Sequence, residues 1–169
     1  MKKNLSIVLA LALMLTASFA LADDGLGVLT AADPAVSVPA ADPAQQLAIE
    51  AVLKEAPSAV INYVLYAPDN RRPEWDVFFT DGAYLGECEV DAETYEVRKF
   101  RSYEAKGEYL TADKAVEALN TAKGPLNVIE LDLDRDDGAL WYEGEAELDG
   151  RRYEFEMSAA GRIVEWERH

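Results

Sequence analysis

Alternation between apolar and acidic residues makes residues 140–157 the clearest pattern in the chain. Between residues 140 and 148, one parity is Leu140, Tyr142, Gly144, Ala146 and Leu148. The other parity is Trp141, Glu143, Glu145 and Glu147. This period of two predicts a half-buried strand. Asp149 and Gly150 then predict a hairpin turn, and the returning strand alternates Tyr153, Phe155 and Met157 with Glu154 and Glu156.

Hydrophobic periodicity elsewhere predicts two helices and further strands. One helix follows Pro43 and covers residues 45–56, and the other follows Thr111, a suitable N-cap residue, and ends at Gly124. Both carry an apolar stripe with helical spacing. The other predicted strands, rich in β-branched and aromatic residues or in alternation, are residues 59–66, 75–80, 84–90, 96–100, 126–134 and 162–166.

An internal repeat organises these elements. Residues 48–52 resemble residues 115–119, and residues 90–92 resemble residues 157–159 at the same offset. We therefore predict an α+β fold of two tandem helix-plus-four-strand units, residues 44–104 and 105–169, with the helices on one face of an antiparallel sheet. The two units could share one continuous sheet, which would remove two exposed edges.

The first residues indicate export. Lys2 and Lys3 precede an apolar run over residues 5–17, and residues 20–22 form an A-x-A cleavage site. We predict a signal peptide over residues 1–22 and a flexible linker rich in Ala, Pro and Asp over residues 23–43. The mature protein is expected in the periplasm or the medium, as a monomer with no membrane association.

The chain is strongly acidic, with a formal net charge of −16. Such a charge repels nucleic acid and anionic lipid surfaces. It either keeps an exported protein soluble or favours a cationic partner.

Few residues are suited to catalysis. The single cysteine, Cys88, has inward parity and is expected to act as a small buried hydrophobe, with a reactive thiol as the alternative. The single histidine, His169, ends the sequence and is expected to fray. No two of the many carboxylates stand out as an acid–base pair. We expect a protein that is not an enzyme and that needs no cofactor.

The ends of the two units resemble a known family. Residues 90–97, VDAETYEV, resemble the V-D-A-x-T-G-E-V ending of PepSY domains, with Tyr95 in place of the glycine. Residues 159–163, AAGRI, resemble a shortened copy, and residues 131–143 with the turn at Asp149 resemble the middle of the family. The resemblance covers residues 44–169 in two copies.

This resemblance implies a secreted α+β domain of the type found in propeptides of thermolysin-like proteases. A tandem PepSY-like protein is also similar in architecture to the β-lactamase inhibitory protein, which binds its target across an open sheet face. Family membership therefore suggests binding or inhibition of an extracellular or periplasmic protein, without identifying the target.

One acidic segment could bind a metal. Asp132, Asp134 and Asp136 alternate, and Glu143 has the spacing of the last ligand of a calcium loop. Asp137 replaces the glycine of such a loop, and the flanks are strands rather than helices. The alternative is an ordinary acidic hairpin turn.

The sheet face turned away from the helices is the other candidate site. Aromatic residues among charges would give a recognition surface a few anchors with a polar surround, although cross-strand pairing alone is the alternative. The predicted partner-binding residues are Tyr66, Phe78, Leu85, Trp141, Glu143, Glu145, Arg152 and Glu154. The expected function is an exported binding module, inhibitor or regulator of an enzyme. The alternative is an acidic, calcium-responsive or structural envelope protein.

Overall fold

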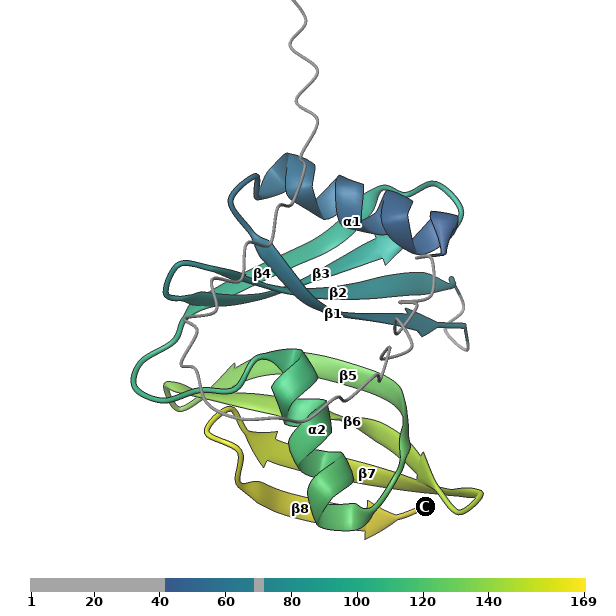
Figure 1. The fold of residues 1–169 in the computed structure, drawn as a ribbon, viewed down its shortest axis with the longest axis vertical. Helices are drawn as coiled ribbons and strands as arrows, with labels where there is room; N and C mark the ends of the chain where they lie inside the picture. The colour runs from purple at the N-terminus through teal and green to yellow at the C-terminus, as the bar shows by residue number, and fades with distance from the viewer. Residues whose placement is uncertain (1–41, 69–71) are drawn as a thin grey trace, which may run out of the picture. The chain divides into compact units, whose positions relative to one another are not determined.

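The computed structural model describes residues 42–68 and 72–169. The predicted signal peptide and nearly all of the predicted linker lie outside the described residues. Within them, a helix followed by four strands occurs twice along the chain (Figure 1). No helix in this part of the chain is long and apolar enough to cross a membrane.

The first unit begins with helix α1 (Pro43–Glu55). Asp42 is its N-cap, and the Asp42 carboxylate accepts a hydrogen bond of 2.9 Å from the Ala44 amide. Pro43 stands in the first turn, where its missing N–H costs nothing. The helix buries Ala48 and Val52 against sheet A.

Sheet A contains four antiparallel strands in chain order. They are β1 (Val60–Ala67), β2 (Glu74–Asp81), β3 (Tyr84–Asp91) and β4 (Val97–Glu104). Helix α1 packs on the face that carries Val77, Phe79, Cys88 and Val90. Cys88 is fully buried there, as the sequence predicts.

The second unit begins with helix α2 (Ala112–Lys123). Thr111 is its N-cap but does not cap the helix with its side chain. Instead, the Asn62 side chain of β1 accepts a hydrogen bond of 3.2 Å from the Ala112 amide, which ties the helix start to the first unit. Gly124, at a φ of 109°, ends the helix as predicted.

Sheet B repeats the topology of sheet A. Its strands are β5 (Asn127–Asp136), β6 (Ala139–Leu148), β7 (Arg151–Ser158) and β8 (Ile163–Arg168), antiparallel and in chain order. The turn residues Asp149 and Gly150 have φ values of 53° and 71°. Both lie in the left-handed region that a tight two-residue hairpin requires, so this predicted hairpin is confirmed.

The two sheets are separate. Strands β1 to β4 form one sheet and β5 to β8 form the other, so the expectation of one continuous sheet is wrong. The α+β class is confirmed. Strand β5 is an edge strand of sheet B. One of its edge amides is paired with a side chain rather than with a neighbouring strand, since Glu87 of β3 accepts a hydrogen bond of 2.7 Å from the Leu133 amide.

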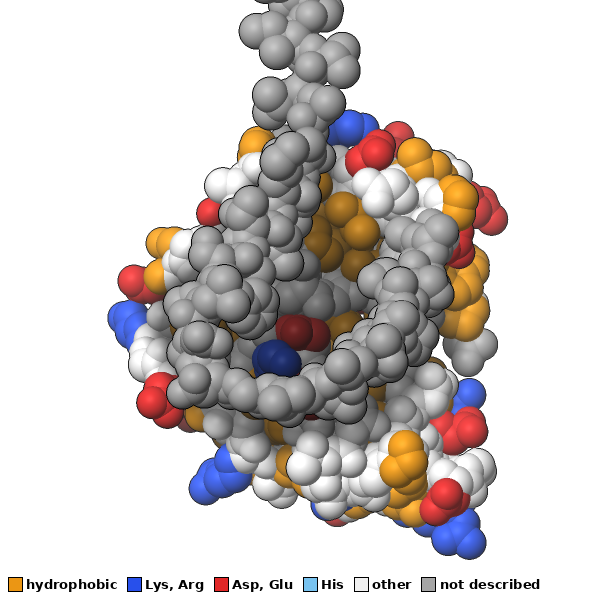
Figure 2. All heavy atoms as spheres, viewed as in Figure 1, with side chains coloured by type: hydrophobic (Ala, Val, Ile, Leu, Met, Phe, Trp, Pro, Cys, Tyr) orange, Lys and Arg blue, Asp and Glu red, His pale blue; other side chains and the backbone are white. Residues whose placement is uncertain are grey.

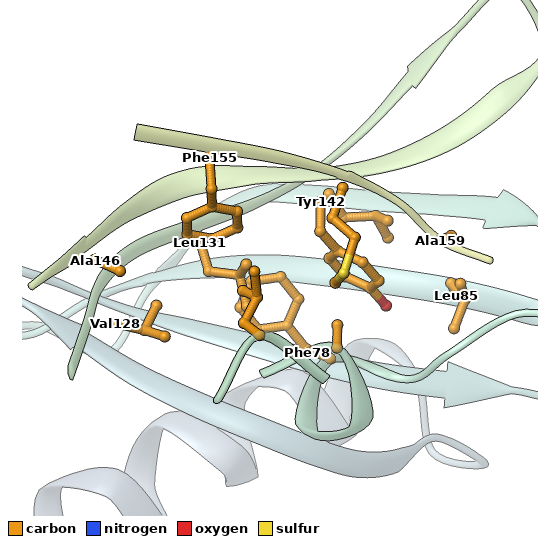
Figure 3. Close-up of a cluster of buried hydrophobic side chains, with 13 residues drawn as sticks. Phe78, Leu85, Val128, Leu131, Tyr142, Ala146, Phe155 and Ala159 are labelled. Atoms are coloured by element: carbon orange, nitrogen blue, oxygen red, sulfur yellow. The ribbon is translucent and has the colours of Figure 1, made fainter. Parts of the chain in front are cut away.

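One hydrophobic core joins the units. The face of sheet A away from α1 contributes Phe78 and Leu85, each 1% exposed, to a cluster with Leu119 of α2 and the inner face of sheet B (Figure 3). Tyr142 lies at its centre, and the Tyr142 hydroxyl donates a hydrogen bond of 3.0 Å to the Leu110 carbonyl. Sheet A is therefore covered on both faces.

Candidate binding face on sheet B

The outer face of sheet B presents two rows of carboxylates that run across its four strands. One row pairs Glu130, Glu145, Glu154 and Glu167 in register, and the next pairs Asp132, Glu143, Glu156 and Glu165. We call these residues the acidic face. Like charges directly opposite each other on a sheet repel, so this arrangement lowers stability.

The acidic face is hollowed. A cavity of about 310 Å³ is lined by Glu130, Asp132, Glu143, Glu145, Glu154, Glu156 and Glu165, together with Gly144 and Phe155. On the face of the molecule shown in Figure 2, acidic, basic and apolar side chains are all visible where the surface is coloured.

Crowding and partial burial make two carboxylates of the acidic face, Glu130 and Glu143, hold protons more tightly. Burial, and then the nearby Asp132 and Glu145, raise the pKa of Glu130 above its ordinary value. Burial, and then the nearby Asp134 and Glu156, raise the pKa of Glu143. A cationic ligand would relieve this repulsion.

Basic side chains reach the acidic face at its margins. Arg101 of β4 lies 2.9 Å from Asp132, and Arg152 lies 3.6 Å from Glu145. His169 Nε2 lies 2.7 Å from Glu154 Oε1 and 3.7 Å from Glu145 Oε1. The backbone amide of His169 also donates a hydrogen bond of 3.2 Å to the Arg152 carbonyl. The expectation that His169 frays is therefore wrong, because the β7–β8 ladder continues through it.

A second acidic group lies between the sheets, and sequence reasoning did not find it. Asp76 is 6% exposed and Glu87 is 2% exposed. Burial, reinforced by neighbouring acids, raises the pKa of Asp76 to about 8. Burial raises the pKa of Glu87 to about 7, although the Leu133 amide and Arg101 act in the opposite direction. In the sequence, the only sign of this group was that Asp76 and Glu87 stand among apolar residues. Alternation assigned both positions to the solvent-exposed face of their strands.

The structure brings most of the predicted binding residues together. Glu143, Glu145 and Glu154 belong to the acidic face, and Trp141 lies beside it, directly opposite Asp134 on β5. Arg152, opposite Glu147 on β6, borders the face.

Three predicted binding residues lie elsewhere. Phe78 and Leu85 belong to the shared core, so their assignment to an open surface is wrong. Tyr66 is 44% exposed, but it lies beside Trp75 on the α1 side of sheet A, with ring centroids 4.9 Å apart. Parity separates the two faces of a strand but does not say which face another unit covers.

The segment considered as a candidate calcium loop is a strand and a tight turn, which agrees with the alternative of an ordinary acidic hairpin. Asp132, Asp134 and Asp136 lie along the extended strand β5, opposite Glu143, Trp141 and Ala139. The connection to β6 is a two-residue turn, Asp137 and Gly138, with φ values of 47° and 83°. Because a strand spaces the aspartates along its length, they cannot converge on one ion as a loop allows.

Comparison with known proteins gives one family match. Residues 109–165 match the PepSY model, described as "Peptidase propeptide and YPEB domain". No curated protein matches the chain. A solved structure of a candidate lipoprotein from Clostridium difficile 630 is 18% identical, with 72% of this chain and 90% of that chain covered and a TM-score of 0.41. The family match falls on the unit that carries the acidic face, and the predicted resemblance to PepSY domains is confirmed over residues 109–165.

Proposed function

We propose that the protein is an exported, non-enzymatic module that binds a basic segment of an extracellular or periplasmic protein on the acidic face. The carrying observation is the pair of carboxylate rows, in register across all four strands of sheet B. Sequences seldom retain like charges opposite each other without a compensating use, because the repulsion lowers stability. A partner carrying Lys or Arg would supply the missing positive charge.

Trp141 gives this surface an apolar anchor. It is half-buried and lies beside the row that contains Glu143, opposite Asp134 and Ser158. Aromatic residues with a polar surround often contribute most of the binding energy of a protein interface. A basic segment with an apolar residue beside its charges would fit both features.

Thiol chemistry is disfavoured by the position of Cys88. The side chain is fully buried under α1, and burial raises the pKa of its thiol to about 12. Since the thiolate is the nucleophile, Cys88 is inert at neutral pH. This supports a role in binding rather than in catalysis.

The test measures binding to a defined probe. We would titrate the protein into a short fluorescein-labelled peptide of alternating lysine and leucine and follow anisotropy. Reversing the charge of Glu143 and Glu156 together (E143K/E156K) should weaken binding at least about tenfold, and added salt should weaken wild-type binding. The matched control is E93K/E108K, the same charge change at exposed positions outside sheet B. Equal weakening in both variants would overturn the proposal.

The finer proposal is that the partner is a peptidase, which the protein inhibits or regulates. It is supported by the peptidase-propeptide description of the matching family. Substrate hydrolysis by secreted serine and thermolysin-type peptidases would be measured with wild-type protein and with E143K/E156K. Inhibition by the wild type alone is expected. Equal inhibition by the wild type and the variant, or no inhibition of any peptidase tested, would contradict a peptidase partner. Neither outcome would affect the peptide-binding result.

The alternative function is cation binding by an acidic, calcium-responsive or structural envelope protein, which the crowding of carboxylates also favours. It predicts that Trp141→Ala leaves peptide binding unchanged and that millimolar calcium raises the melting temperature. The binding module predicts the reverse: Trp141→Ala weakens binding several-fold.

A further inference from the structure

Two glutamates and the single histidine converge at one corner of the acidic face. Glu145 of β6 and Glu154 of β7 are direct cross-strand partners, and His169 follows the end of β8. Their three ligand atoms lie within 4.8 Å of one another. Two are carboxylate oxygens and one is an imidazole nitrogen, so the cluster differs in kind from the all-acid rows around it.

The backbone holds this cluster in place. Glu145 and Glu154 lie within paired strands, and the His169 amide bonds to the Arg152 carbonyl on the neighbouring strand. Arg152 approaches Oε2 of Glu145, whereas His169 approaches Oε1. One Glu145 oxygen therefore interacts with the arginine while the other faces the imidazole.

We propose that Glu145, Glu154 and His169 bind a divalent transition-metal ion, of which Zn²⁺ is the best fit. Zinc takes imidazole nitrogen and carboxylate oxygen at about 2.0–2.2 Å in a tetrahedral arrangement, which places ligand atoms roughly 3.4 Å apart. Movements of about 1 Å by these partly exposed side chains bring the three atoms to that spacing. The fourth position remains for water or for a side chain of a bound partner.

The surroundings favour a divalent cation over the metal-free state. Without metal, Glu145 and Glu154 face each other as like charges, with His169 and Arg152 as basic neighbours. The remaining carboxylates of the acidic face raise the local concentration of cations. Imidazole selects zinc, copper or nickel over calcium and magnesium, which prefer oxygen ligands alone.

Isothermal titration of the full, tag-free chain with zinc chloride tests this inference. We expect one site, at least about tenfold weaker in H169A and in E154Q, as loss of a ligand requires. The matched control E165Q removes a carboxylate of the same face outside the cluster and should change the affinity less than about twofold. Calcium chloride should not compete at equal concentration.

A second readout uses the fact that the chain contains only one histidine. Its ring proton signals in an NMR spectrum should shift or broaden on addition of one equivalent of zinc, in wild type and in E165Q alike. Unchanged histidine signals, or zinc affinity that survives in H169A, would overturn the site.

This site needs no protein partner, so its outcome is separable from that of the proposed function. Zinc binding without peptide binding would leave the metal site standing alone. Peptide binding unaffected by H169A, with no zinc binding, would leave only the binding face.

Discussion

The two units share one order of elements, yet the same sheet face is used in opposite ways. In sheet A, the face away from the helix is buried in the shared core; in sheet B, the corresponding face is open and acidic. At the offset that aligns Val90 with Met157, the residues Tyr63, Leu65, Phe78 and Leu85 align with Glu130, Asp132, Glu145 and Arg152. A few apolar-to-charged differences therefore separate a buried face from an open one.

The acids of this face are kept in both units. Asp76, Glu87 and Glu89 align with Glu143, Glu154 and Glu156. On the covered face of sheet A, Glu87 accepts a hydrogen bond of 2.7 Å from the Leu133 amide and lies 3.2 Å from Arg101. Asp76 on the same face is desolvated, and its pKa is raised. In the open unit, water can solvate the aligned acids. The comparison teaches that when such a face is covered, a buried acid either pairs with a donor, as Glu87 does, or holds its proton more tightly, as Asp76 does.

The largest difference in stability should come from two single variants, in which Phe78 and the aligned Glu145 each receive the side chain type of the other. Phe78→Glu places a charge in the shared core and should destabilise the protein by more than about 4 kcal/mol. Glu145→Phe adds an apolar ring to a face that water reaches, and its effect should stay within about 1 kcal/mol. Urea denaturation followed by tryptophan fluorescence measures both.

Phe78→Leu is the control, because it keeps the position apolar while shortening the side chain. Its loss should be well below that of Phe78→Glu. A small effect of Phe78→Glu would contradict the idea that the units share one core.

The buried acids should make stability fall as pH rises. Burial holds the folded-state pKa of Asp76 at about 8 and of Glu87 at about 7, both above the ordinary values. The folded protein then retains protons that the unfolded chain has released, so stability is greatest near about pH 4 and declines toward about pH 8. Melting temperatures across this range measure the decline.

Asp76→Asn should flatten this decline, since the amide keeps the shape of the side chain without titrating. The groups that face Asp76 are Glu74 on its own strand, Glu87 and Glu89 on β3 and Asp132 on β5, with Lys99 and Arg101 of β4 beside those acids. An unchanged slope in this variant would show that other groups control the pH dependence.

Removing one charge from the open face should give a small gain in stability. Glu143→Gln relieves repulsion from Asp132 and Glu156 and should stabilise the protein by about 0.5 kcal/mol at low salt. Added salt should narrow the gain, because screening already weakens the repulsion in the wild type. A loss of stability would show that Glu143 makes favourable contacts that outweigh the repulsion.

Local chemistry explains which parts of the fold were predictable. The turn at Asp149 and Gly150, the end of α2 at Gly124 and the alternation of β6 each depend on neighbouring residues, and the structure agrees with all three. The acidic face followed from the same alternation. The local alternation of apolar and acidic residues therefore located strands β6 and β7 and most of the candidate site.

Long-range packing explains what was missed. Phe78 and Leu85 have the parity of an open face, and only the docking of the second unit shows that they are buried. The support for His169 comes from the Arg152 carbonyl on a neighbouring strand, which no local pattern reveals. Likewise, the amide that Glu87 accepts from belongs to the other sheet. Each of these contacts joins residues that are distant in sequence.

The open, charged face of sheet B also limits what can pack against it. A further helix-plus-four-strand unit could dock only against an apolar face such as that of sheet A. The outer face of sheet B carries eight carboxylates instead. In this respect the outer face of sheet B resembles the polar outer face of a capping repeat in a solenoid protein. Replacing those carboxylates with the aligned residues of the first unit would create an exposed apolar face. Copies of the chain could then associate head to tail and form an open filament.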